Sequence, residues 1–226
     1  MVRESFQEDL ENLKDRVSQL GRRVEEALIN AVDALRQGDL QKSQALISED
    51  RDINEKRFDI ESDLLVLIAT QQPMASDLRL LAAMLELTTE LERIGDYAKG
   101  IAKINLLMGD RRLIEAPPKI SEMAAKARDM LHRAIDAFME QNVDLAKAIP
   151  SEDDEVDALY NSVYADLLAY IMDDASKMEQ ANYLMWAAHN LERTADRVTN
   201  ICERVIFIVT GKMQEFKPDF GLESIP

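Results

Sequence analysis

The sequence predicts an all-α protein made of six long helices, arranged as two repeated three-helix bundles. Its 226 residues include only 7 Gly and 6 Pro, with 5% aromatic and 46% hydrophobic side chains. Turns are therefore scarce, while the apolar content is sufficient for a core. Apolar residues recur at alternating intervals of three and four, as on helices that bury one face. The two halves of the chain also repeat each other.

Helix-breaking residues divide the chain into six segments with helical periodicity. The first segment ends at Gly38, the second before Pro73 and the third at Gly109. The fourth ends before Asn142, and the fifth begins after Pro150. The predicted helices are 4–37, 40–71, 75–108, 119–141, 152–175 and 177–210.

The widest interruption, from Gly109 to Pro118, separates three helices from three. At an offset of 103, matching residue types occur in pairs of segments: 31–34 with 134–137, 48–50 with 151–153, and 63–65 with 166–168. A shortening by three residues near Pro73 then changes the offset to 100. The sequence therefore predicts one repeat in residues 1–110, a second in 115–212, and a tail in 213–226. Short links between antiparallel helices favour up-down packing within each repeat.

The net charge of −16 opposes direct binding to nucleic acid or to an anionic membrane surface, because both are densely negative. No uninterrupted apolar run approaches the roughly 20 residues of a membrane span, and the first residues lack the apolar stretch of a secretion signal. We therefore expect a cytoplasmic protein without direct membrane insertion. The single cysteine, Cys202, is predicted to be a small buried thiol.

The sequence contains one acidic phrase twice. Leu91-Glu92-Arg93-Ile94-Gly95-Asp96 is followed one hundred positions later by Leu191-Glu192-Arg193-Thr194-Ala195-Asp196. Carboxylates four residues apart share a helix face, where like charges repel by a few tenths of a kcal/mol. The apolar seams run through Leu91 and Leu191, so at about 100° per residue both acid pairs are predicted to face outward. Small and apolar residues near those acids, including Leu81, Gly95 and Ala195, suggest a binding surface.

A second pair of positions with the same spacing occurs in the preceding helix of each repeat. These positions are Asp50 and Asn54 in the first repeat, and Asp153 and Asp157 in the second. Each repeat thus brings carboxylates from two helices towards one patch. Clustered oxygen ligands suit Mg²⁺, Ca²⁺ or Mn²⁺, and bridging carboxylates also hold iron. Because Asn54 removes one charge, any metal should bind more tightly in the second repeat. The competing interpretation is a solvated acidic face neutralised by Arg93 and Arg193.

With two three-helix repeats, each carrying Glu/Asp-x-x-x-Asp within Leu-Glu-Arg-x-x-Asp, the chain resembles the PhoU family from about Phe6 to Lys212. The phrase that begins at Gln72-Pro73-Met74 also resembles the family's first repeat. The resemblance implies a non-enzymatic, homodimeric negative regulator of the phosphate-starvation response. It would couple the phosphate ABC transporter ATPase to a sensor histidine kinase, at the inner face of the membrane through these partners. The implied metal ligands are Glu92, Asp96, Glu192, Asp196, Asp153 and Asp157. Asp50 belongs to the same set, and Asn54 stands where the family pattern expects a second carboxylate.

Two other functional classes remain open at this stage. A carboxylate-bridged metal oxidase of the ferritin-like type would place Glu and Glu-x-x-His inside a four-helix bundle, but neither His132 nor His189 completes that motif. His189 lies three residues before Glu192 and could add a nitrogen ligand. A metal-free helical adaptor would share the fold and use its carboxylates to meet basic surfaces on partner proteins.

Overall fold

The computed structural model describes residues 2–216, and no strand occurs in this range. The long helices are α1 (Val2–Gln37), α2 (Leu40–Gln71), α3 (Ala75–Met108), α4 (Pro118–Glu140), α6 (Asp153–Asp173) and α7 (Met178–Thr210). Their bounds confirm the predicted all-α class and agree with the six predicted ranges to within two residues. No helix in the described range is long and apolar enough to cross a membrane.

A short additional helix, α5 (Val143–Ala148), lies where the sequence analysis predicted only an interruption. The Asn142 side chain begins α5 by accepting a hydrogen bond from Leu145 N at 3.0 Å. Pro150, which lacks a backbone N–H, then falls within a 3₁₀ turn, Ile149–Glu152, that leads into α6. The repeat offset of 103 aligns Asn142 with Asp39, which caps α2 in the same way through Lys42 N. The segments α5 and α6 are thus a broken counterpart of α2.

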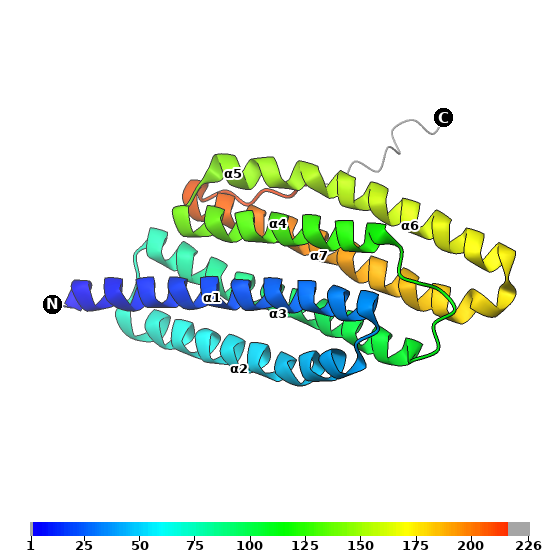
Figure 1. Cartoon of the computed structure of the whole chain (residues 1–226). Helices are drawn as coiled ribbons and strands as arrows, with labels where there is room; N and C mark the ends of the chain where they lie inside the picture. The colour runs from blue at the N-terminus through cyan, green and yellow to red at the C-terminus, as the bar shows by residue number, and fades with distance from the viewer. Residues whose placement is uncertain (1, 217–226) are drawn as a thin grey trace, which may run out of the picture.

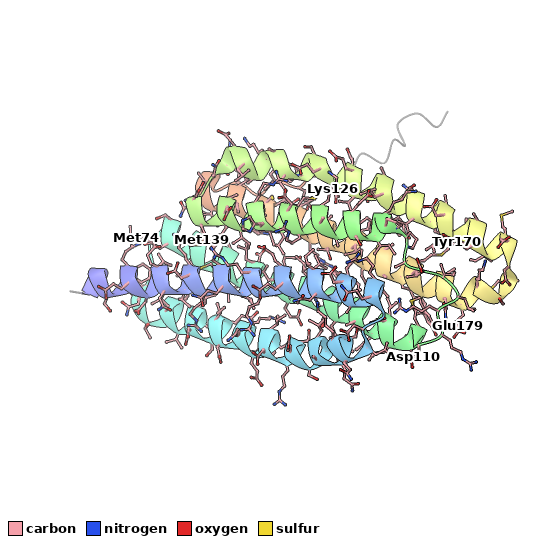
Figure 2. All side chains as sticks on the ribbon, viewed as in Figure 1. Met74, Asp110, Lys126, Met139, Tyr170 and Glu179 are labelled. Carbon is pink, nitrogen blue, oxygen red and sulfur yellow. The ribbon has the colours of Figure 1, made fainter. Side chains whose placement is uncertain are left out.

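The helices α3 and α7 form the centre of the molecule. The helix α3 packs against α1, α2 and α7, and α7 packs against α3, α4 and α6 (Figure 1). The two apolar helix faces that contain Leu91 and Leu191 are buried as predicted. One continuous hydrophobic core joins the two repeats. In Figure 2, Met74 and Met139 lie at one end of the bundle, and Tyr170, Glu179 and Asp110 lie at the other. The elongated shape therefore follows directly from antiparallel packing of long helices.

Polar contacts reinforce the junction between the repeats. Arg197 Nη1 lies 3.3 Å from Glu90 Oε2, and Arg197 Nε donates to the hydroxyl of Tyr97 at 3.4 Å. Arg204 Nε lies 2.6 Å from Glu86 Oε2 further along the same junction. Each of these contacts joins a side chain of α7 to one of α3.

A buried polar cluster joins the α1–α2 turn to the end of α3. The amide nitrogen of Asn105 donates to Ala34 O at 3.0 Å, to Asp39 O at 3.0 Å and to Ser43 Oγ at 2.7 Å. The amide oxygen of Asn105 accepts from Arg112, in the α3–α4 loop. One fully buried side chain therefore satisfies groups from three separate segments.

Two smaller predictions concern the carboxy-terminal part of the chain. The thiol of Cys202 is buried as predicted, and burial raises its pKa to about 12. The predicted tail begins at Met213, and within it Phe216 packs against the core and donates from its backbone N–H to Glu203 Oε1 at 2.7 Å. The first residues of the tail therefore run back along α7. Residues 217–226 lie outside the described range.

Candidate functional site

The predicted acidic residues gather in two places, each between a central helix and its outer neighbour. The repeat-1 cluster combines Asp50 and Asn54 of α2 with Glu92 and Asp96 of α3. The repeat-2 cluster combines Asp153 and Asp157 of α6 with Glu192 and Asp196 of α7. The sequence analysis thus paired the correct helices in both repeats.

The predicted outward orientation of the acids in the duplicated phrase is wrong for Glu92. Glu92 is 9% exposed and Asp50 is 6% exposed. The small residues around them form a helix–helix contact and not a free surface: Leu81 and Ala195 are fully buried, and a Cβ on Gly95 would lie 3.4 Å from Ile53. The reason is that α2 and α6 cover the flanks that point away from the main seams. The carboxylates therefore line the edges of packed helix pairs.

The repeat-1 cluster already contains basic side chains. Lys99 Nζ lies 2.6 Å from Asp50 Oδ2 and 3.6 Å from Asp96 Oδ1, so the ammonium group connects α2 with α3. Arg57 Nη1 lies 3.6 Å from Glu92 Oε1, and Arg93 lies within 4 Å of both Glu92 and Asp96. Asn54 donates from its amide to Asp50 Oδ2 at 3.2 Å. Basic side chains of the chain itself thus accompany these carboxylates, although burial, reinforced by Asp96, still raises the pKa of Glu92.

The repeat-2 cluster has more acid and less compensation. Arg193 Nη1 lies 3.2 Å from Asp196 Oδ2, and His189 Nδ1 lies 3.1 Å from Glu192 Oε2. Glu192 Oε2 and Asp153 Oδ1 are nevertheless buried without a hydrogen-bond partner among the residues that the structure describes, as is Glu92 Oε2 in the repeat-1 cluster. Such orphaned acceptors are unusual in folded proteins, so they indicate a place where another donor or a cation would be stabilised.

The electrostatics of the repeat-2 cluster reflect this excess of negative charge. Burial, reinforced by the carboxylates of Asp196, Asp157 and Glu192, raises the pKa of Asp153 to about 7. Burial also raises the pKa of Asp157 and of Glu192, and in each case the nearby Asp196 carboxylate acts in the same direction. In the metal-free protein, Asp153 therefore changes protonation near neutral pH.

We expect the stability of the metal-free protein to depend on this titration. Because the pKa of Asp153 rises from 3.8 in the unfolded chain to about 7, the folded state binds the proton more tightly. The resulting stabilisation is complete below about pH 4 and is lost as the pH rises through 7. After a discount for the partial exposure of Asp153, this titration changes the free energy of unfolding by about 1–2 kcal/mol. With chelator present, Asp153→Asn should raise the melting temperature at pH 8 by about 2–6 °C and leave it unchanged near pH 4.

Asp154→Asn is the matched control for this experiment, because Asp154 is the exposed neighbour of Asp153 on the same helix turn. It removes the same formal charge but not the buried carboxyl. Equal stabilisation by both substitutions at pH 8 would attribute the effect to overall negative charge, and would contradict the assignment to Asp153.

A hollow of about 420 Å³ opens beside the repeat-2 cluster. Asp153, Asp157, Asp196 and Thr199 line it, together with Lys147 and Phe216 and a few neighbouring residues. Asp50 and Lys99 of the repeat-1 cluster line a different hollow of about 170 Å³, together with residues of α1 such as Arg23 and Asn30. The second repeat therefore offers more space beside its carboxylates.

The donor sets can be tested against the metal that the sequence analysis expects. Within residues 2–216, no three Asp, Glu, His or Cys side chains already converge on one point at a spacing that would hold an ion. The repeat-2 cluster fits a hard cation in its chemistry, with four carboxylates and two orphaned buried oxygens, once its side chains turn towards a common point. The repeat-1 cluster does not fit, because Lys99 lies between its carboxylates.

Sequence reasoning found the acidic residues but missed the neighbours that distinguish the two clusters. The repeat offsets align Lys99 with Thr199, and Arg57 with Tyr160. A comparison of these aligned positions would have revealed that one repeat carries two cations where the other has neutral side chains.

Comparisons with known proteins agree with this architecture. The PhoU domain matches residues 17–104 and 120–205, which together make up most of the chain. The chain belongs to the PhoU family. It is 34% identical over 213 residues to the phosphate-specific transport system accessory protein PhoU homolog of Clostridium acetobutylicum, covering 94% of this chain and 97% of that protein. It is 31% identical to PhoU of Escherichia coli, covering 94% and 87%.

Solved PhoU structures have the same fold. The crystal structure of the phosphate transport system regulatory protein PhoU from Streptococcus pneumoniae gives a TM-score of 0.86 at 28% identity, covering 93% of this chain and all of that one. PhoU from Pseudomonas aeruginosa gives 0.86 at 30% identity, covering 92% and 100%. The resemblance inferred from the duplicated phrase is thus confirmed, and both acidic phrases fall within the matched PhoU domains.

Proposed function

We propose that this chain is a non-enzymatic accessory regulator of phosphate-specific transport. The observation that carries the proposal is the match, over nearly the full length of both chains, to proteins named as accessory to that transport system. A regulatory role agrees with the names of the relatives, which describe accessory and regulatory proteins of phosphate transport.

The proposed partners are the phosphate transporter ATPase and a sensor histidine kinase, with the regulator at the cytoplasmic face of the membrane and acting as a homodimer. A net charge of −16 favours encounter with basic protein surfaces and opposes direct capture of phosphate, itself an anion. The signal would then reach this protein through its partners. In a strain that lacks its own PhoU-family protein, this chain should restore repression of a phosphate-starvation reporter. Continued full expression of the reporter would contradict the proposed role.

The second part of the proposal is a metal ion, or a small metal cluster, held by the repeat-2 cluster. Its four carboxylates supply the oxygen ligands that Mg²⁺, Mn²⁺ and Ca²⁺ prefer, and bridging carboxylates also hold iron. A cation there would neutralise carboxylates that now repel one another and would give Asp153 Oδ1 and Glu192 Oε2 a partner.

Elemental analysis tests the metal directly. Protein purified without a histidine tag and without chelator should contain stoichiometric metal, and the double variant Asp153→Asn, Glu192→Gln should lose it. A variant with Asp129→Asn and Glu155→Gln is the matched control, because it removes the same charge from exposed positions on α4 and α6. Metal-free native protein that still represses the reporter would support the adaptor alternative, in which the carboxylates form a docking surface.

The ferritin-like oxidase has no specific support in the structure. In that class the ligands project into the bundle interior, whereas here the clustered carboxylates lie at the edges of the α2–α3 and α6–α7 helix pairs. Both histidines also have acidic neighbours instead of a shared centre: His132 Nδ1 lies 3.2 Å from Glu25 Oε2, and His189 pairs with Glu192.

A further inference from the structure

The two repeats differ at the position that lies between their carboxylates. In the repeat-1 cluster, Lys99 Nζ is 2.6 Å from Asp50 Oδ2 on α2 and 3.6 Å from Asp96 Oδ1 on its own helix. A positive group thus already joins carboxylates of two helices, which is what a bridging metal ion would do. The aligned residue of the second repeat, Thr199, is neutral, and its hydroxyl donates to the backbone oxygen of Asp196 at 2.7 Å.

The surrounding charges follow the same division. In the first repeat, the three carboxylates of Asp50, Glu92 and Asp96 lie near three cations, Lys99, Arg57 and Arg93, although Arg57 also pairs with Glu61 at 2.7 Å. In the second repeat, four carboxylates are paired with one arginine, Arg193. The position aligned with Arg57 is Tyr160, whose ring lies against His189. Exposed Lys147 lines the hollow beside these carboxylates.

We propose that Lys99 is a built-in cation that takes the place of metal in the repeat-1 cluster, so that this chain binds metal only through its second repeat. This inference rests on the metal-binding part of the proposed function. A divalent ion entering the repeat-1 cluster would have to displace the ammonium group from Asp50, and the displaced Lys99, carried on the same helix as Asp96, would still repel the ion.

The charges of the two clusters should therefore respond differently to metal. The first keeps its positive charges whether or not metal is available, because its cations are covalently part of α2 and α3. The second changes its charge when a cation enters or leaves. A partner that detects metal occupancy would therefore need to contact only the flank formed by α6 and α7.

The test uses Mn²⁺ as the probe, with binding followed by calorimetry and by electron paramagnetic resonance. We expect the native chain to lose Mn²⁺ binding in Asp153→Asn, Glu192→Gln and to keep it in Asp50→Asn, Glu92→Gln. Thr199→Lys, which keeps every carboxylate, should weaken Mn²⁺ binding at least tenfold. Thr199→Met, similar in length but uncharged, should bind Mn²⁺ like the native chain.

The reverse exchange tests the first repeat. Asn54→Asp, Arg57→Tyr, Lys99→Thr gives the repeat-1 cluster the residues of the second repeat, and we expect it to gain additional bound Mn²⁺. Circular dichroism checks that each variant folds. If the triple variant does not fold, the Thr199→Lys variant still tests the proposal.

The possible outcomes separate this inference from the proposed function. Loss of native Mn²⁺ binding in Asp50→Asn, Glu92→Gln, or unchanged binding in Thr199→Lys, would overturn the role of Lys99. A native chain that binds no Mn²⁺ while the triple variant does would contradict only the proposed metal site in repeat 2. The absence of binding in both proteins would overturn the two proposals together.

Discussion

Leu91→Ala should lower the free energy of unfolding by about 3–4 kcal/mol, the largest effect that we expect from a single substitution. Leu91 is fully buried on α3, which contacts α1, α2 and α7 and thus joins both repeats. Shortening it removes apolar contacts and leaves a cavity that long packed helices can fill only by moving together. Urea unfolding followed by circular dichroism measures the loss, and Leu191→Ala, at the aligned and equally buried position on α7, should cost a similar amount.

The same prediction also concerns the number of transitions in the unfolding curve. Because one hydrophobic core joins the repeats, each variant should still unfold in a single transition. Leu65→Ala is the control, since that leucine is 57% exposed on α2 and should change stability by less than about 1 kcal/mol. Two separated transitions in Leu91→Ala would mean that the repeats fold independently, against this expectation.

Asn105→Ala should cost about 2–3 kcal/mol, the second largest effect. The substitution removes the donor to Ala34 O, Asp39 O and Ser43 Oγ, and leaves these groups with fewer partners in a site that excludes water. An unsatisfied buried polar group costs about 1–3 kcal/mol, and Arg112 loses its acceptor as well. Thermal and urea unfolding measure the loss, and hydrogen exchange should locate increased opening at the α1–α2 turn.

Asn161→Ala is the matched control for this prediction, because Asn161 is exposed on α6. It should change stability by less than about 0.5 kcal/mol. If Asn105→Ala were equally mild, the turn would be held by helix capping and apolar packing, and the buried amide would add little.

The helices were predictable because local chemistry determines where they begin and end. Gly38, Gly109 and Gly211 have positive φ values of 64–70° at or next to helix ends, a conformation that glycine adopts without steric cost. The exception was α5, because a proline one turn beyond it suggested an interruption. Pro150 does break the helix, but only after Asn142 has begun a new one.

Burial at the candidate site could not be predicted in the same way. The helical period gives the angle between Glu92 and the seam through Leu91, but not which neighbouring helix covers that angle. The same limit explains why Lys99 was missed. It pairs with Asp50, which lies 49 residues earlier on another helix, and only the packing of α2 against α3 brings them together. The acidic residues repeat visibly along the chain, and so do Arg93 and Arg193, whereas Lys99 and Arg57 occur in one repeat only and follow no motif.

The break at Pro150 has a consequence for recognition. Helix α2, with 32 residues, is an unbroken rod of about 48 Å, whereas its counterpart is divided into α5, a 3₁₀ turn and α6. Pro150 and Ser151 of that break line the larger hollow. The duplicated sequence therefore produces two unequal flanks, one with an unbroken helix and one with a broken helix beside the larger hollow. A rigid partner shaped to one flank would meet a different surface on the other.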